Sequence, residues 1–413
     1  MISVEEALCR ILEVIVPLGR EKVNILDSLG RVIGEDIYAS RNIPPKDNSA
    51  MDGYALRWED TRGASKEKPI ILNVVEDIPA GAIPRKSVAA GEASRIMTGA
   101  PLPVGANAVV RVEDTQKDGQ RVTIFEEAEK GQDIRCAGED VREGHLVISQ
   151  GDIIRPAEVG MLAALGRSFI YVYQRPLVAV VATGDELVDI DTVPSPWQIV
   201  SSNSYSTAAQ IIECGGAPLQ IGIAKDRRDD LIGKFREAMR ADIIISSGGV
   251  SVGDYDLVKD IMKEVGNQMQ FWQVAMRPGK PLAFGAMGGI PIFGLPGNPV
   301  SSMVSFEQFV RPSILKMTGH KNLFRRTIKA TLQEDITKKK GTKHFIRSRV
   351  EYREGEFAVT TTGEQGSGIL KSMVRANGLI ILHEKATSVK KGDKVTVQLI
   401  DRTFEQTAKP EYL

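Results

Sequence analysis

The sequence has few of the residues from which sulfur-based or histidine-based sites are built. Its 413 residues include three cysteines and four histidines. Cys9, Cys136 and Cys214 lie far apart and form no CxxC pair, and the histidines form no HExxH motif. This spacing argues against a disulfide framework and against a cysteine-based zinc site. Any metal site is therefore expected to consist of oxygen ligands.

The chain also lacks an excess of charge of either sign and lacks any long apolar run. Lys and Arg number 53, as do Asp and Glu, so no overall field attracts nucleic acid. No apolar run approaches the ~18 residues that cross a bilayer. The first ten residues, MISVEEALCR, lack the basic and apolar regions of a signal peptide. We therefore expect a cytoplasmic protein that binds neither nucleic acid nor a membrane.

Common nucleotide-binding and nucleophile motifs are missing as well. No GxGxxG follows the first strand of the α/β pattern described below, and no GxxxxGK[ST] is present. No Ser-His pair stands at a recognisable nucleophile elbow. Dinucleotide-binding and P-loop interpretations are therefore weak. The hydrophobic content of 42% and the charged content of 26% are ordinary for a soluble globular protein, and the length allows about two to four domains.

Hydrophobic patterning predicts a multi-domain α/β protein. From about Arg175 strands and helices alternate, which is typical of a doubly wound parallel sheet. The segment around 69–135 is a series of short strands broken by Pro and Gly, and strands return after Gly319. Ser3 and Glu6 form a capping box at the start of a helix. We expect four domains: an extended N-terminal and linker domain (1–44 and 139–174), an inserted β-rich domain (45–138), a central α/β domain (175–320) and a small C-terminal β-barrel (321–413).

The segment SSGGVSVGD at 246–254 follows an apolar run that reads as a buried strand. In an open α/β sheet, ligands bind just beyond the carboxyl ends of the strands. Glycines let backbone N–H groups approach a phosphate closely; those of the segment are Gly248, Gly249 and Gly253. Asp254 and Asp256 follow and suit a hard cation such as Mg²⁺. A glycine-rich turn with a helix-capping aspartate explains the same residues.

Acidic residues follow consecutive strands of this pattern. Asp185 and Glu186 come after the first strand, Asp226 after the second, and Asp254 and Asp256 after the third. Because the loops after parallel strands share one edge of a sheet, we expect these carboxylates to converge. As an alternative, Asp226 caps the helix that follows it.

Two turns in the same region carry groups that suit an anion. Arg277 and Lys280 flank a Pro-Gly turn, where Arg offers a planar fork and Lys a compact charge; a plain surface turn is the alternative. At LPGNP, Asn298 is a candidate N-cap and Pro299 a candidate first helical residue, so the free N–H groups there stabilise an anion. An ordinary helix start accounts for this pair equally well.

Three turns outside the α/β region are further candidates for ligand binding. Asp52 lies in NSAMDGY and Thr98 in RIMTGAP, and TTTGEQGS at 360–367 offers hydroxyls and glycines for a phosphate rim. As isolated motifs, all of these are explained by turn chemistry alone.

Taken together, the motifs resemble the molybdopterin molybdotransferase family, which includes bacterial MoeA and the C-terminal part of gephyrin. They run in this order over nearly the whole chain: NSAMDGYA, RIMTGAPLP, IRCAGEDV, VVATGDEL, SSGGVSVGD, MRPGKP, GLPGNPVSS and TTTGEQGS. The resemblance implies a homodimer that binds adenylated molybdopterin, Mg²⁺ and molybdate. It also implies release of AMP, transfer of molybdenum to the pterin, and a molybdopterin adenylyltransferase as the upstream partner.

The resemblance assigns roles by motif. It implies that the catalytic residues are Asp52, Asp256, Asp226 and Glu186, and that the last three hold the metal. It implies that substrate is bound by Thr98, Asp140, Asp185, Gly248, Gly249, Ser251, Gly253, Arg277, Lys280, Pro296, Asn298, Pro299, Arg347 and Ser367. Some members of the family carry Lys where this chain has Arg277, which keeps the charge but changes its geometry. Some also carry Lys where this chain has Gln273, so the resemblance implies that one pocket cation is missing or relocated. A receptor-clustering scaffold like gephyrin and a tungstate-inserting enzyme are the alternatives.

Overall fold

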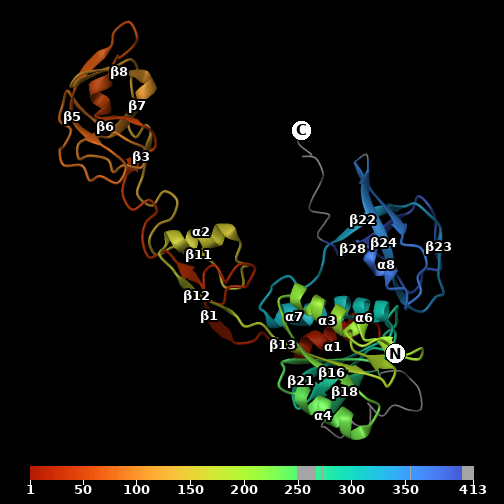
Figure 1. The fold of residues 1–413 in the computed structure, drawn as a ribbon. Coiled ribbons are helices and arrows are strands. Elements are labelled where there is room, and N and C mark those ends of the chain that lie inside the picture. The colour runs from red at the N-terminus through yellow and green to blue at the C-terminus, as the bar shows by residue number, and fades with distance from the viewer. Residues whose placement is uncertain (249–266, 272, 354, 402–413) are drawn as a thin grey trace.

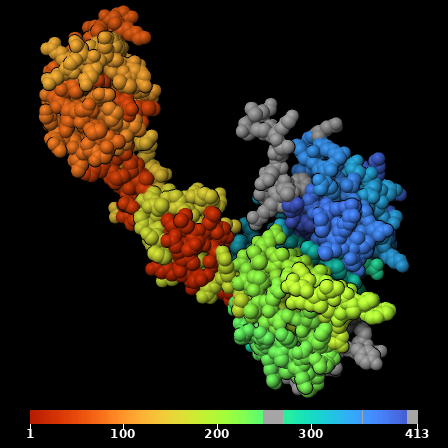
Figure 2. Space-filling view, viewed as in Figure 1, coloured from red at the N-terminus to blue at the C-terminus, as the bar shows by residue number. Residues whose placement is uncertain are grey.

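The computed structural model describes residues 1–248, 267–271, 273–353 and 355–401. The molecule is elongated (Figures 1 and 2). The inserted residues, orange in Figure 1, lie at one end. The linker, in red and yellow, leads from them to the α/β domain in green, and the C-terminal strands in blue lie beside that domain. The expected multi-domain α/β architecture is confirmed.

The α/β domain contains a six-stranded mixed sheet in the order β16-β13-β17-β21-β20-β18. Its strands are β13 (Leu177–Thr183), β16 (Ala217–Ala224), β17 (Ile243–Ser247), β18 (Asn267–Phe271), β20 (Ala283–Met287) and β21 (Ile290–Leu295). β16, β13, β17 and β21 run parallel, as predicted, whereas β20 pairs antiparallel with both β21 and β18. The difference arises at Gly288 and Gly289, which both have positive φ and join β20 to β21 in a tight hairpin. A tight hairpin reverses the chain, whereas a parallel pair needs a long crossover.

Helices cover both faces of this sheet. They are α1 (Val4–Val14), α3 (Ser202–Glu213), α4 (Arg228–Ala238), α6 (Pro299–Ser305), the π-helix η3 (Phe306–Val310) and α7 (Arg311–Met317). Alternate residues of β13 point to opposite faces: Val178 and Val180 pack with α1, α3, α6 and α7. Ala179 and Val181 pack with α4. The doubly wound arrangement is therefore confirmed.

Helix α1 packs with the α/β domain and not with the linker domain in which the sequence analysis placed it. Half of the predicted capping box forms: the Glu6 N–H donates to Ser3 Oγ over 3.0 Å, whereas the Glu6 carboxylate accepts a hydrogen bond from Arg10. Ala7 and Ile11 are fully buried in the same core as Val178 and Phe293. A short amphipathic helix is stabilised mainly by burying its apolar face, and the sheet supplies the larger apolar surface.

The linker domain pairs strands from two separate parts of the chain. β1 (Arg20–Asn24) pairs with β12 (Phe169–Tyr173), and β2 (Ile37–Tyr38) pairs with β11 (Leu146–Ile148). Helix α2 (Pro156–Ala164) covers them. The inserted domain is a six-stranded sheet in the order β7-β4-β6-β5-β9-β8. Its elements are β3 (Asn48–Ser49), β4 (Gly53–Leu56), η1 (Trp58–Thr61), β5 (Ile70–Ile78), β6 (Glu92–Ile96), β7 (Ala108–Arg111), η2 (Val112–Asp114), β8 (Thr115–Asp118), β9 (Arg121–Ile124) and β10 (Ile134–Arg135).

The C-terminal domain is a closed barrel, as predicted. Strands β24, β25, β22, β28 and β26 pair in this order, and β26 returns to β24. The domain's elements are β22 (Thr327–Leu332), β23 (Ile336–Thr337), β24 (Lys343–Arg353), β25 (Glu356–Thr361), α8 (Lys371–Val374), β26 (Gly378–Leu382), β27 (Ser388–Val389) and β28 (Lys394–Leu399). The short strand β19 (Met276–Arg277) also pairs with β24, so the chain next to the α/β domain adds a strand to the barrel.

Candidate functional site

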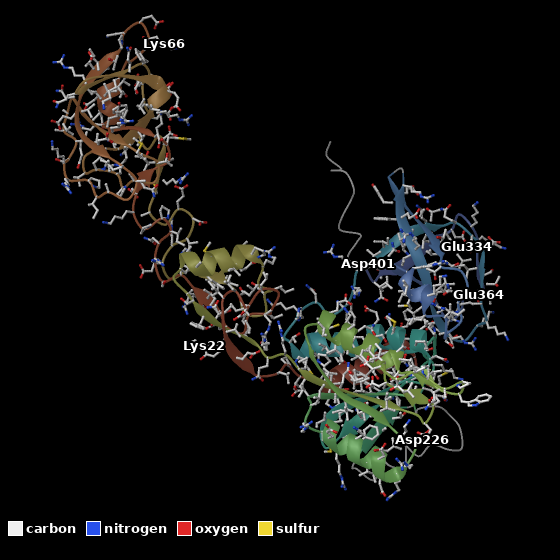
Figure 3. All side chains as sticks on the ribbon, in the orientation of Figure 1. Lys22, Lys66, Asp226, Glu334, Glu364 and Asp401 are labelled. Atoms are coloured by element: carbon white, nitrogen blue, oxygen red, sulfur yellow. The ribbon has the colours of Figure 1, made fainter. Side chains whose placement is uncertain are left out.

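The acidic residues that follow β13 and β16 come together. The backbone N–H of Asp226 donates to Asp185 Oδ1 over 3.1 Å, and Figure 3 labels Asp226 on the α/β domain. Partial burial, followed by repulsion from Asp185 and Glu186, raises the pKa of the Asp226 carboxyl. The N-cap of α4 is Arg227, so Asp226 does not occupy the capping position that the sequence left open.

These carboxylates carry the donor atoms that a hard cation takes. All their donor atoms are oxygens, which Mg²⁺ prefers. The mutual repulsion that raises the pKa of Asp226 is relieved by a bound positive charge. Among the described residues, no group of three or more His, Cys, Asp and Glu side chains is arranged to hold a metal. Asp256, the remaining predicted ligand, lies outside the described residues, as does Asp254.

The glycine turn begins where β17 ends. Gly248 has φ +94°, and its N–H donates to the Leu295 carbonyl over 3.2 Å. A Cβ at this position would lie 2.6 Å from the Thr183 carbonyl oxygen. Only glycine therefore fits between the ends of β13 and β21. Other predicted members of this turn lie outside the described residues: Gly249, Ser251 and Gly253.

Asn203, which the sequence analysis did not single out, connects this turn to the LPGNP loop. It is the second residue of α3, and its side-chain Nδ2 donates to Ser247 Oγ over 2.9 Å and to the Gly297 carbonyl over 2.8 Å. A Cβ on Gly297 would lie 3.8 Å from Gly248 Cα, so the two loops are adjacent. No motif marks Asn203, because both partners come from distant parts of the chain.

The LPGNP loop contacts the C-terminal domain. Asn298 is the N-cap of α6 by position and Pro299 is its first residue, as predicted, and Pro296 is buried. Within the described part of the chain the Asn298 side chain makes no capping hydrogen bond. The N–H of Val300 donates to the Ser367 carbonyl over 3.1 Å. The TTTGEQGS segment of the barrel, predicted as a phosphate rim, therefore lies next to the start of α6.

Arg277 and Lys280 are exposed on the MRPGKP turn. Gly279 between them has φ +99° and packs against Ser305, since a Cβ there would lie 2.5 Å from Ser305 Oγ. Arg277 faces His344 across the β19–β24 pairing. Burial, followed by the positive charges of Lys338 and Arg277, lowers the pKa of His344 to about 4. The two cations are therefore held between the α/β domain and the barrel.

Arg347 lies beneath the barrel's glycine-rich loop. Its side chain is among the largest that are fully buried, and burial lowers its pKa to about 10. Nε donates to Ser372 Oγ over 3.1 Å, and a terminal nitrogen donates to the Gly366 carbonyl over 3.0 Å. The arginine thus holds the loop immediately before Ser367.

The residues predicted in the inserted domain form a second cluster. Asp52 Oδ1 accepts hydrogen bonds from the N–H and the hydroxyl of Thr98, both over 2.7 Å. These bonds lower the pKa of Asp52. Asp140 lies where the chain re-enters the linker domain, with an exposed side chain. Within one chain this domain lies far from the α/β domain (Figure 2), so Asp52 and Thr98 do not join the acidic residues there.

Comparison with known proteins gives a consistent result along the whole chain. Residues 2–166 match a family described as the MoeA N-terminal region (domain I and II). Residues 179–316 match a probable molybdopterin binding domain, and 329–400 match the MoeA C-terminal region (domain IV). No helix within the described ranges is long and apolar enough to cross a bilayer.

Individual relatives match over nearly their full lengths. The chain is 40% identical to molybdopterin molybdenumtransferase 2 of Mycobacterium tuberculosis, over 91% of this chain and 94% of the relative. It is 37% identical to the molybdopterin molybdenumtransferase of Staphylococcus aureus, over 97% of this chain and 96% of the relative. The crystal structure of the molybdopterin biosynthesis MoeA protein from Pyrococcus horikoshii OT3 superposes with a TM-score of 0.83 at 32% identity, over 97% of this chain and 100% of that chain.

The fold and the matches define a multi-domain protein built around an α/β domain of the molybdopterin-biosynthesis type. The chain belongs to the MoeA family of molybdopterin molybdenumtransferases. The predicted family resemblance is confirmed.

Proposed function

We propose that this transferase inserts molybdenum from molybdate into adenylated molybdopterin and releases AMP. Family membership supports a role in molybdenum cofactor biosynthesis. The observation that carries the finer reaction is the convergence of carboxylates and a glycine turn at one edge of the sheet. A pyrophosphate link needs this combination of backbone donors and nearby counter-charge.

The chain's own residues supply positioning and charge. Cleavage of a pyrophosphate depends on charge neutralisation and orientation more than on a protein nucleophile. Arg277 and Lys280 bind the oxyanion, because an anion in a partly dry site requires paired cations. Asp226 and Glu186, with Asp256, hold Mg²⁺, and Asp185 orients the turn through the Asp226 N–H. When bound there, Mg²⁺ supplies further neutralisation of the pyrophosphate charge.

The complete site is shared between two copies of the chain. Asp52 and Thr98 are already hydrogen bonded to each other in the inserted domain, which lies far from its own α/β domain. In a homodimer of elongated chains, this cluster and Asp140 reach the α/β domain of the other copy. The enzyme works in the cytoplasm and receives adenylated molybdopterin from an adenylyltransferase.

The decisive experiment measures AMP release. Purified protein is incubated with adenylated molybdopterin, with and without molybdate and Mg²⁺. We expect AMP to appear only when both are present. AMP release that needs tungstate and not molybdate supports the tungsten alternative, and tight pterin binding without any AMP release supports a scaffold.

A further inference from the structure

Asn203 connects the end of β17 to the loop that follows β21. The two strands pair in parallel up to Ser247 and Leu295, and the Gly248 N–H adds one more backbone bond to the Leu295 carbonyl. Beyond that point the chain continues as the Gly248 turn on one strand and as Pro296–Gly297 on the other. The Asn203 side chain, from α3, donates to Ser247 Oγ and to the Gly297 carbonyl and so bridges the last residue of β17 and the loop after β21.

The orientation of the Asn203 amide is fixed by chemistry. The Gly297 carbonyl only accepts hydrogen bonds, so the nitrogen must face it. Both hydrogens of Nδ2 are then used, one for the end of β17 and one for the LPGNP loop. The oxygen Oδ1 is left buried, without a hydrogen-bond partner in the described ranges. An unsatisfied buried acceptor is unfavourable and calls for a functional explanation.

We infer that Asn203 is a positioning residue of the anion site. It holds the end of β17 and the LPGNP loop after β21 at a fixed spacing, beside the strand ends where the proposed function places the pyrophosphate. This inference rests on the proposed function and adds a residue to it.

The same helix provides a matched control. Gln210, two turns further along α3, donates from Nε2 to the Met303 carbonyl over 3.2 Å, and its Oε1 is likewise buried without a partner in the described chain. Its amide therefore shares the buried oxygen of Asn203 but makes one hydrogen bond in place of two, and its partner lies inside α6 and away from the strand ends. Substitution of Gln210 disturbs α3 to a similar degree without touching either loop.

The test measures binding of AMP and of inorganic pyrophosphate to the full-length protein by calorimetry, beside its melting temperature. We expect Asn203→Ala to raise the Kd for pyrophosphate about tenfold, because two hydrogen bonds are lost. Asn203→Asp has nearly the same shape, but its carboxylate cannot donate to the Gly297 carbonyl and repels the ligand. It should weaken binding further, and added salt should reduce only this extra loss. Ser247→Ala removes one bond and should have a smaller effect than Asn203→Ala.

Gln210→Ala and Gln210→Glu should lower the melting temperature as much as the Asn203 variants do, with the Kd unchanged. Unchanged affinity in folded Asn203→Ala overturns the inference. So does an equal loss of affinity in Gln210→Ala, and so does a wild-type protein that binds neither probe. The experiment measures ligand binding and not turnover, so its result does not depend on the proposed reaction. Weakened binding in Asn203→Ala supports the inference even if molybdate triggers no AMP release.

Discussion

Thr98 donates two hydrogen bonds to the same carboxylate oxygen of Asp52, one from its backbone and one from its hydroxyl. Forty-six positions separate the two residues in the chain, yet NSAMDGY and RIMTGAP form one exposed unit on the inserted domain. Such bonds favour the ionised carboxylate. The domain therefore presents a fixed negative group at its surface, which suits a role in the site of another copy.

Removal of the Thr98 hydroxyl should raise the pKa of Asp52 toward its ordinary value. Thr98→Val keeps the backbone N–H, which is the larger cause of the lowered pKa, so the rise should be partial. Carboxyl-detected NMR titration measures it. Thr123→Val, on β9 of the same domain, is the control and should leave the Asp52 titration unchanged. An unchanged titration in Thr98→Val would show that the hydroxyl bond is absent in solution.

Two inactive variants should restore activity together. Asp52→Ala disables the inserted domain, and Asp226→Ala disables the acidic residues of the α/β domain. In a mixed dimer, one site contains neither substitution, so AMP release should return toward half of the wild-type rate per dimer. Tagged heterodimers purified after subunit exchange provide the measurement. Heterodimers that stay inactive would place each complete site within one chain.

The molybdate dependence of turnover should identify the oxyanion site. Lys280→Ala should raise the molybdate concentration for half-maximal turnover about tenfold, or about 1.4 kcal/mol of binding. Arg277→Lys should be milder, since the charge remains and only the planar fork is lost. Assays at saturating pterin and Mg²⁺ decide this, with the exposed Lys340→Ala as control. A normal molybdate dependence in Lys280→Ala would move the oxyanion to the helix start at Asn298.

His344 should make the protein less stable in acid. Its pKa of about 4 in the folded chain lies below the ordinary value near 6.5, so the folded state binds fewer protons than the unfolded state. The stability that neutral His344 contributes is complete above about pH 6.5 and is lost as the pH falls toward about 4. His344→Gln should therefore flatten the dependence of the unfolding free energy on pH in this window. His383→Gln, at an exposed position, should not.

Arg347 should matter more to folding than its exposed neighbour on the same strand. Arg347→Ala leaves the Gly366 carbonyl and Ser372 without their charged partner and should cost about 3 kcal/mol or more. Arg349, two residues along β24, has a side chain that is 61% exposed, and Arg349→Ala should cost less than about 0.5 kcal/mol. Urea unfolding compares them. Equal stabilities would show that the two hydrogen bonds of Arg347 contribute nothing to the stability of the fold.

The sequence determined the architecture and most of the residues of interest, because these follow from local rules. Period-two and helical patterns predicted the doubly wound sheet and the barrel. Asp185, Asp226 and Gly248 were found because each lies within two residues of a strand end, and the ends of parallel strands share one edge. Ser3 and Glu6 revealed the start of α1 by their spacing alone.

Tertiary structure decided what depends on partners remote in the chain. The β20–β21 hairpin makes the sheet mixed. Helix α1 packs on this sheet and not on the linker domain, because the sheet offers the larger apolar surface. Arg277 lies in a β-strand only because its backbone pairs with β24 of the barrel. Asn203 is the clearest case: its partners lie 44 and 94 positions away. A single side-chain amide has no periodicity or motif, so only the packing of α3 over the strand ends assigns it a role.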